Sequence, residues 1–174
     1  MKDINIRYDT VLLKEISEYE AEKIYLWYSK EVGYADATGL NTGLSWEKFD
    51  RMWRQAILKQ NEFFLAIYYK ESSEVAGFIK GIVAKDDPST IFITALAIDT
   101  DLRRRGIGTN ALKAILLGLN SGNGCNSVFV TVDSENNIGL QFWRKNGFHI
   151  IKTIRKRLTA ENSYILVNLM KIET

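Results

Sequence analysis

The spacing of apolar residues changes several times along the chain, and each change marks the border of a predicted element. Apolar residues over Ile4–Leu13 predict a first strand. The letters S-E-Y-E over Ser17–Glu20 form a capping-box signature, so a helix is expected to begin there and to run to about Lys30. A second helix, capped by Ser45, is predicted from one apolar face made of Trp46, Phe49, Trp53, Ala56 and Ile57.

Three runs of apolar and β-branched residues follow, separated by short polar turns. They are Phe63–Tyr69, Val75–Ala84 and Ile91–Ile98, and their close spacing predicts an antiparallel meander. Beyond the meander the pattern predicts, in order, a buried helix over Thr109–Leu119, a strand over Val128–Val132, a helix over Asn136–Lys145 that Gly147 ends, and two strands over Phe148–Leu158 and Tyr164–Met170.

This order of elements predicts an α+β domain with a mixed, mostly antiparallel sheet. The strand–helix–strand unit between Ile91 and Val132 should place its two strands parallel, with a right-handed crossover. A chain of 174 residues with a single proline and no proline- or serine-rich linker suits one domain. We therefore expect a single domain over residues 1–174.

Composition narrows the class of protein. The net charge of +2 is too small to predict a nucleic-acid partner, and the apolar runs are much shorter than the roughly 20 residues that cross a membrane. The single cysteine, Cys125, excludes an internal disulfide framework and suggests a reducing compartment. One histidine and one cysteine cannot form a zinc site. We expect a soluble, cytoplasmic protein with no nucleic acid, membrane or metal as partner, and a homodimer is compatible with the sequence.

The segment Arg103–Thr109 lies between a strand and a buried helix and combines three arginines with two glycines. Glycines let the backbone approach a ligand closely. The first N–H groups of a helix lack internal partners and carry positive potential. Arginines add fork-shaped donors that suit phosphate. This turn therefore predicts an anion site.

The identity of the anion has several interpretations. The P-loop string G-x-x-x-x-G-K-[ST] is absent from the sequence. The dinucleotide fingerprint G-x-G-x-x-G/A is formally matched by Gly106, Gly108 and Ala111, but no acidic residue follows about 20 positions later. A basic surface loop with ordinary glycines is the plain alternative.

The turn also resembles a family signature. Arg103-x-x-Gly106-x-Gly108 is similar to the [QR]-x-x-G-x-[GA] motif of the GNAT superfamily of acyl-CoA-dependent N-acyltransferases. The segment Ala95–Asp99 resembles the strand that precedes this motif in the family. Downstream, Asn136–Phe148 is similar without a gap to the family pattern N-x-x-A-x-x-L/F-Y-x-x-x-G-F. Two separated motifs in the correct order and spacing make the resemblance specific.

The resemblance implies a mechanism. In this family acetyl-CoA lies between two parallel strands that splay apart, here those ending near Ile98 and Val132, and the substrate amine attacks the thioester directly. An N–H near Ile98 would stabilise the oxyanion. A branched side chain at Gly108 would crowd the pyrophosphate. By motif position, the residues that would bind acetyl-CoA are Leu96, Ala97, Ile98, Arg103, Arg104, Arg105, Gly106, Ile107, Gly108, Thr109 and Asn136.

Two catalytic positions depart from the family pattern. Trp143 stands where the family often has a tyrosine that protonates the leaving thiolate, and Thr94 stands where it often has a glutamate base. Candidate substitutes are Asp133, Tyr28 and Tyr34. Because positioning supplies more rate than acid–base help, we expect an active N-acetyltransferase. The alternative is a non-catalytic acyl-CoA-binding or regulatory module.

The acceptor amine is open at this stage. The region between Tyr28 and Trp53 is aromatic and contains carboxylates, which suits a cationic amine. A polyamine, an aminoglycoside, an amino acid and a protein N-terminus are all compatible. A second basic cluster, over Lys152–Arg157, is typical of a solvated strand end. Together with Arg103–Arg105 it could draw an anionic substrate or the 3′-phosphate of the cofactor.

Overall fold

The computed structural model describes residues 4–29, 43–70, 72–118, 125–157 and 164–173. These ranges contain the helices α1 (Glu18–Ser29), α3 (Trp46–Leu58), α4 (Ile107–Gly118) and α6 (Asn137–Lys145), and the short 3-10 turn η1 (Thr100–Leu102). They also contain the strands β1 (Asn5–Tyr8), β2 (Val11–Glu15), β3 (Glu62–Tyr69), β4 (Val75–Val83), β5 (Thr90–Ile98), β6 (Ser127–Asp133), β7 (His149–Arg157) and β8 (Tyr164–Glu173).

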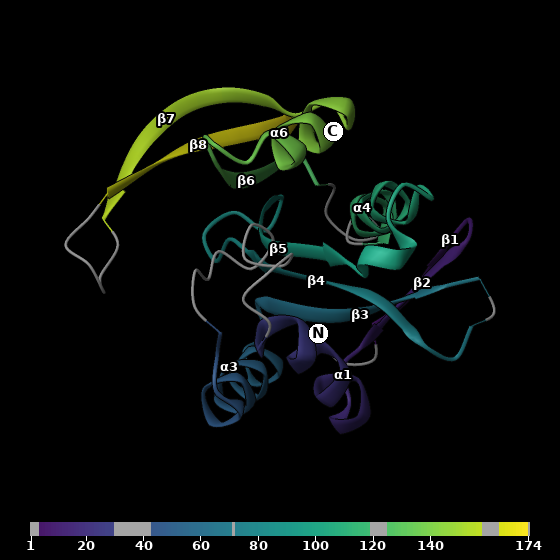
Figure 1. Cartoon of the computed structure of the whole chain (residues 1–174). Helices are drawn as coiled ribbons and strands as arrows, with labels where there is room; N and C mark the ends of the chain where they lie inside the picture. The colour runs from purple at the N-terminus through teal and green to yellow at the C-terminus, as the bar shows by residue number, and fades with distance from the viewer. Residues whose placement is uncertain (1–3, 30–42, 71, 119–124, 158–163, 174) are drawn as a thin grey trace.

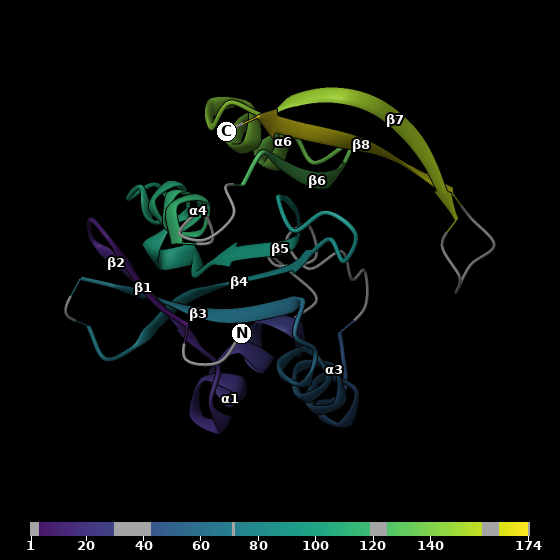
Figure 2. The same cartoon turned by 180° about the vertical axis from the view of Figure 1, so that it is seen from behind.

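The eight strands form one sheet in the order β1-β2-β3-β4-β5-β6-β8-β7. Helices α1 and α3 lie on one face of the sheet and α4 on the other, as Figure 1 and the reverse view in Figure 2 show. The α3 face carries an apolar cluster that includes Phe64, Phe78 and Ala97. The α4 face carries a second cluster, to which α6 contributes Leu140 and Trp143. The α+β prediction is confirmed.

The pairing confirms most of the predicted topology. Strands β3, β4 and β5 form the expected antiparallel meander, and β5 pairs parallel with β6. The prediction of one first strand over Ile4–Leu13 is wrong, because β1 and β2 form a hairpin. The chain reverses at Asp9, which has a left-handed φ of 49°. Asp tolerates this conformation better than most residues, so a turn forms there without glycine or proline.

The predicted helix ends are present for α1 and α6. The Glu20 carboxylate reaches back to accept a hydrogen bond from the Ser17 N–H at 2.8 Å, which is one of the two bonds of a capping box, and the Ser17 hydroxyl also donates to this carboxylate. The Asn136 side-chain oxygen accepts from the Gly139 N–H at 2.7 Å and caps α6. Gly147 ends α6 with a φ of 89°, which glycine adopts without strain.

Burial along the strands falls from the middle of the sheet to its last edge. In β3 all residues from Phe63 to Tyr68 are buried, because helices cover both faces there. In β6 burial alternates, with Val128, Val130 and Val132 buried against the α4 face and the residues between them more exposed. All nine residues of β7 are exposed. The sheet thus passes from two covered faces to one and then to none.

A β-bulge divides β5 into two parts. Ile93 pairs with Gly81 and Ala95 with Lys80, so Thr94 is an extra residue that the strand register leaves without an opposite residue on β4. Before the bulge, Ile91 and Ile93 point to the α4 face. After it, Ala95 and Ala97 point to the α3 face, and Leu96 and Ile98 pack on the α4 side. One inserted residue therefore exchanges the two faces of the strand.

Candidate active site at the β5–β6 splay

The parallel strands β5 and β6 pair over only part of their length. Their register runs from Thr90 with Ser127 to Ile93 with Val130 and stops at the Thr94 bulge. Both strands continue beyond this point, β5 to Ile98 and β6 to Asp133, but no longer as partners. Strand β6 stays paired with β8 up to Asp133. The separation is therefore a splay between β5 and β6, visible in Figure 1.

The splay leaves the hydrogen-bonding edge of β5 without a strand partner beyond Ile93. The Asp99 N–H donates to the Ala76 carbonyl on β4 at 2.9 Å. Because the bonding direction alternates along an antiparallel strand, the polar groups of Ala97 also face β4, and those of Leu96 and Ile98 face away from it, toward the splay. A side chain at Gly77 would collide with the Ala97 carbonyl oxygen, which agrees with this direction. Of the three predicted backbone residues, Leu96 and Ile98 therefore face the gap, and Ala97 does not.

Helix α4 begins beside the end of β5. The Asn110 N–H donates to the Gly106 carbonyl at 2.9 Å, which closes the first helical turn. The N–H groups from Gly106 to Thr109 precede this bond and have no partner within the helix. Arg104 and Gly106 have left-handed φ values of 65° and 80°. Turns that alternate in hand gather successive N–H groups into a concavity that attracts anions.

The three arginines of this turn have different roles. The Arg103 Nε donates to the Ile98 carbonyl at 3.1 Å, so this guanidinium fastens the turn to the end of β5. An Arg105 Nη donates to the Asp101 carbonyl at 3.2 Å. The Arg104 side chain is exposed, as are those of Arg103 and Arg105. The predicted basic turn is thus a positively charged surface around the start of α4.

Gly108 brings three elements together. A Cβ on Gly108 would lie 3.2 Å from a ring carbon of Phe142 on α6 and 3.6 Å from Ile98. A side chain at Gly108 would therefore be directed toward Phe142, and the expectation that it would crowd the pyrophosphate stays a prediction. The missing side chain lets the first turn of α4 pack closely between β5 and α6. Gly106, by contrast, has open space around it and is required for its φ.

Asp133 and Asn136 lie across the splay, where β6 turns into α6. The Asp133 Oδ1 accepts from the Glu135 N–H at 2.9 Å, and its carbonyl accepts from the Asn136 N–H at 3.1 Å. Asn136 caps α6. Both predicted residues thus shape the turn at the end of β6, and Asp133 brings a carboxylate to that end of the splay.

The two departures from the family pattern are placed differently. Trp143 is buried, with its ring centroid 5.0 Å from that of Phe142 and 4.9 Å from that of Phe148, both edge-on. Its position is that of a packing residue of the α4 face. Thr94 is exposed, and its hydroxyl donates to the Lys80 carbonyl at 3.2 Å. Sequence reasoning found this position by alignment but had no signal for its role as the bulge.

The aromatic region that the sequence suggests for a cationic amine forms the core between α1, α3 and the sheet. Tyr28 is only 4% exposed, between Phe49 and Phe78, and burial raises the pKa of its phenol far above the ordinary value. Trp53 is buried as well. Tyr34 lies outside the described residues. A shallow hollow between α1 and α3, lined by Trp46, Asp50 and Arg54, is on the face opposite α4.

No group of three His, Cys, Asp or Glu side chains among the described residues could hold a metal ion. No helix in the described part of the chain is long and apolar enough to cross a membrane.

Comparison with known proteins decides the family. Residues 16–148 match the acetyltransferase (GNAT) family. The chain belongs to this family. Its motif residues therefore occupy a GNAT fold, with the splay between β5 and β6 beside the Arg103–Thr109 turn.

Solved structures share this fold across nearly the whole chain. The acetyltransferase from Salmonella typhimurium that modifies the N-terminal serine of ribosomal protein L7/L12 has a TM-score of 0.83 at 15% identity, over 98% of this chain and 99% of its own. Spermidine N-acetyltransferase from Vibrio cholerae, solved with CoA and spermine, has a TM-score of 0.79 at 12% identity, over 94% of this chain and 95% of its own. At these identities the likeness shows the fold.

A sequence relative matches a shorter segment. The L-2,4-diaminobutyric acid acetyltransferase of Virgibacillus pantothenticus is 37% identical over 51 residues, which are 29% of this chain and 32% of the relative. The match thus spans about a third of that protein's length.

Proposed function

We propose that this GNAT acetyltransferase transfers the acetyl group of acetyl-CoA to a primary amine of a small molecule, a peptide or a protein. The observation that carries the proposal is the edge of β5 beyond the bulge, where Leu96 and Ile98 turn their polar groups to a gap that β6 no longer fills. Such an edge binds an extended, amide-containing chain as it would bind an added strand. The pantetheine arm of CoA is such a chain.

The remaining contacts to acetyl-CoA follow from the start of α4. The N–H groups of Gly106, Ile107, Gly108 and Thr109 would bind the pyrophosphate, since a helix N-terminus favours negative charge. Arg104 and Arg105 would add positive charge at the surface, and Arg103 would hold the loop against Ile98. Ala97, whose polar groups face β4, would contribute its small side chain. Asn136, at the cap of α6, would contact the cofactor from across the splay.

The reaction needs few groups from the protein. The neutral amine attacks the thioester carbon, a C–N bond forms, the C–S bond breaks, and one proton moves from nitrogen to sulfur. The Ile98 N–H would donate to the carbonyl oxygen as negative charge develops on it. We propose that Asp133, directly or through water, accepts the amine proton. Trp143 would act by packing rather than by giving a proton, because its ring lies in the core of the α4 face.

Magnitudes favour activity despite the two departures. General acid–base help is worth about 10²–10⁴-fold. Holding the amine against the thioester can contribute roughly 7–11 kcal/mol, or about 10⁵–10⁸-fold. An enzyme that keeps the second effect and loses part of the first is still a catalyst. The single cysteine is consistent with a cytoplasmic enzyme, which we propose on that ground.

A thiol-release assay tests the proposal. Acetyl-CoA is supplied with a panel of amines, namely an amino acid, a polyamine, an aminoglycoside and a peptide with a free N-terminus. We expect CoA release that depends on at least one amine. The buried position of Trp143 favours the second candidate, a non-catalytic acyl-CoA-binding module. Thermal stabilisation by acetyl-CoA, with no CoA release for any amine, would support that module and contradict the transferase.

A further inference from the structure

Several lysines and two phenylalanines lie on one face of the sheet beyond α3. Strand register places Ile82, Phe92 and Phe129 opposite one another across β4, β5 and β6, and Lys171 of β8 opposite Phe129. Directly paired residues point to the same face, and so do residues two apart on one strand. Lys80 therefore shares this face with Ile82. Its Nζ lies 5.7 Å from the ring centroid of Phe64, which belongs to the α3-face cluster.

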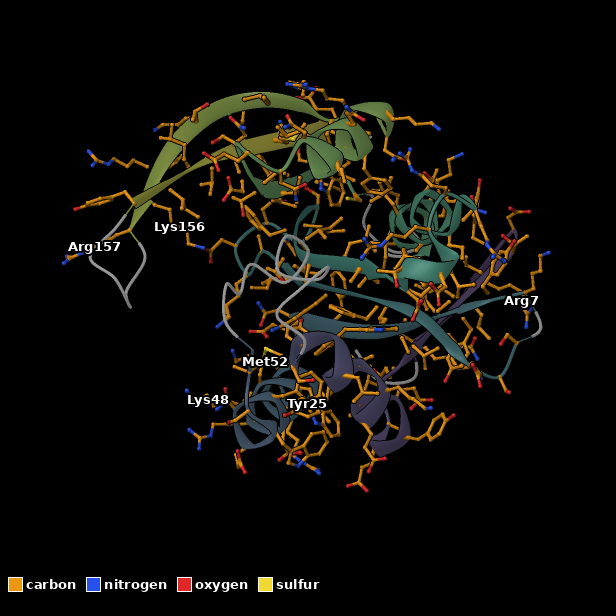
Figure 3. The ribbon with its side chains drawn as sticks, viewed as in Figure 1. Arg7, Tyr25, Lys48, Met52, Lys156 and Arg157 are labelled. Atoms are coloured by element: carbon orange, nitrogen blue, oxygen red, sulfur yellow. The ribbon has the colours of Figure 1, made fainter. Side chains whose placement is uncertain are left out.

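The same register extends along the β7–β8 arm, which we define as β7 together with residues 164–169 of β8. Lys152 pairs with Leu169, Ile154 with Val167, and Lys156 with Ile165. Leu169 lies two residues from Lys171 on β8, so the two side chains point to the same face. The paired residues of the arm therefore continue the face of the sheet on which α3 lies. We call this series the open face of the arm. Figure 3 shows Lys156 extending from the arm toward the body of the molecule, on the side where α3 lies, and Arg157 extending away from it.

The open face and the sheet face that it continues are aromatic and apolar, with lysines along them. The register places two carboxylates on the same face, Asp133 opposite Val167 at the end of β6 and Glu62 opposite Ile82. The rings of Phe92 and Phe129 stack with their centroids 5.1 Å apart, and Phe92 is 40% exposed. Lys171 Nζ lies 5.5 Å from the Phe129 centroid and 2.9 Å from the exposed Glu173 carboxylate. Among the described residues no carboxylate forms an ion pair with Lys152 or Lys156. Lys80 is attracted electrostatically by Glu62, which lies opposite Ile82 on the same face.

The arm has a one-sided charge. Its described residues include four lysine and arginine side chains, one histidine and no acidic side chain. Lys152 and Lys156 are on the open face, and Arg155 is on the opposite face, with its guanidinium 4.0 Å from the Tyr164 ring centroid. Such a surface repels a polyamine and also a second copy of the same arm. It attracts an acidic partner.

We propose that the acceptor is an acidic polypeptide segment that presents its amine at the β5–β6 splay and extends along the open face of the arm. The inference rests on the proposed transferase function. Lys152 and Lys156 are four residues apart on one strand, or roughly 13 Å at about 3.3 Å per residue. Carboxylates at positions i and i+4 of an extended peptide have the same spacing. The apolar Ile154 between the two lysines favours a peptide side chain over a phosphate backbone.

Two matched peptides test the proposal. One is Ala-Gly-Glu-Ser-Val-Ser-Glu-Ser with an amidated C-terminus, and the other has glutamine in place of both glutamates. We expect kcat/KM for CoA release to be about tenfold higher for the acidic peptide at low ionic strength, and the preference to shrink as salt screens the charges. Lys152→Glu/Lys156→Glu should abolish the preference for the acidic peptide.

The arm supplies its own control. Lys156→Glu and Arg155→Glu each change the charge by the same amount at adjacent positions on opposite faces, so only Lys156→Glu should reduce the preference. Equal rates for the two peptides, or equal effects of the two substitutions, would overturn the inference while CoA release still supports the transferase. Binding of labelled peptides, followed by fluorescence anisotropy, gives a readout without turnover. There, stronger binding of a single-stranded RNA oligonucleotide than of the acidic peptide would also overturn it.

Discussion

Strands β3 and β6 belong to the same sheet but differ in how many of their faces are covered. β3 is buried on both faces, and its sequence from Phe63 to Tyr68 is apolar without interruption. β6 alternates between buried valines and more exposed residues, and its neighbour β5 leaves it at Ile93. The covered half of the sheet stabilises the fold. Beyond Thr94, β5 and β6 no longer pair with each other, and β6 has one face that is more exposed, so backbone groups and part of a sheet face lack a strand or helix partner.

Deletion of Thr94 should have the largest effect of the changes considered, because the Thr94 bulge separates the two parts of β5. Without the extra residue, Leu96 and Ile98 would exchange faces with Ala95 and Ala97. Because each large aliphatic side chain lost from a core costs about 2–5 kcal/mol, we expect a loss of more than about 4 kcal/mol in the free energy of unfolding. Denaturant unfolding measures it. Thr94→Ala, which keeps the bulge, should cost less than about 1.5 kcal/mol. A deletion variant as stable as Thr94→Ala would contradict the account of the bulge.

Trp143→Ala tests whether Trp143 stabilises the core of the α4 face or takes part in proton transfer. Removing a buried indole should cost about 3–5 kcal/mol. The conservative Trp143→Phe should stay folded and keep kcat close to that of the unchanged protein. A variant Trp143→Tyr that restores the residue often found in the family should also leave kcat nearly unchanged. A rise in kcat for Trp143→Tyr, with KM unaltered, would instead assign the position to proton transfer.

Gly108→Val sharpens the description of the border between the two halves. Its side chain would meet Phe142 and displace the first turn of α4 from β5. We expect acetyl-CoA to bind at least about tenfold more weakly, which is about 1.4 kcal/mol, in isothermal titration. Overpacking should also reduce stability by about 1–3 kcal/mol. Lys113→Val, at an exposed position of the same helix, is the control, and it should retain affinity. Equal affinities for the two variants would remove the start of α4 from the binding site.

The smallest expected effect lies in the covered half. Partial burial opposes ionisation of Glu20, but hydrogen bonds from Ser17 and Tyr68 outweigh it and lower the pKa of this carboxyl below its ordinary value of 4.5. A lowered pKa contributes stability above the unfolded value, and this stability disappears as the pH falls through the folded value. Glu20→Gln should therefore lower Tm at neutral pH. The corresponding loss in the free energy of unfolding should be less than about 1 kcal/mol, because the group is partly exposed. The difference should vanish in acid.

Thermal unfolding at several pH values measures this difference. Glu22→Gln, at an exposed position of α1, should change Tm little at any pH. A gap between Glu20→Gln and the unchanged protein that widens in acid would contradict the assigned network.

Much of the fold could be predicted because it depends on local pattern. The meander follows from three apolar runs with short turns, and the parallel pair follows from the crossover rule. The hairpin at Asp9 was missed because aspartate adopts a left-handed φ there without the glycine that usually marks such a turn. The motif residues around Gly106 could be found by resemblance, since they combine helix start, glycine and charge within one segment.

The bulge and its consequences could not be predicted in the same way. In the run Ile91–Ile98 one extra residue leaves no local signature, because its effect appears only in the pairing with β4. For that reason sequence reasoning treated Leu96, Ala97 and Ile98 alike, although alternation turns Ala97 toward β4. Likewise, the cluster over Lys152–Arg157 gave no sign of its two faces until the register with β8 separated Lys156 from Arg155.

Amide hydrogen exchange, followed by NMR with and without acetyl-CoA, tests the central claim most directly. The claim is that the edge of β5 beyond Thr94 binds the pantetheine arm. It predicts that acetyl-CoA slows exchange at the Leu96 and Ile98 N–H groups by about tenfold or more, while Ala97, already bonded to β4, changes little. Unchanged exchange at Leu96 and Ile98 with acetyl-CoA saturating the protein would contradict the claim.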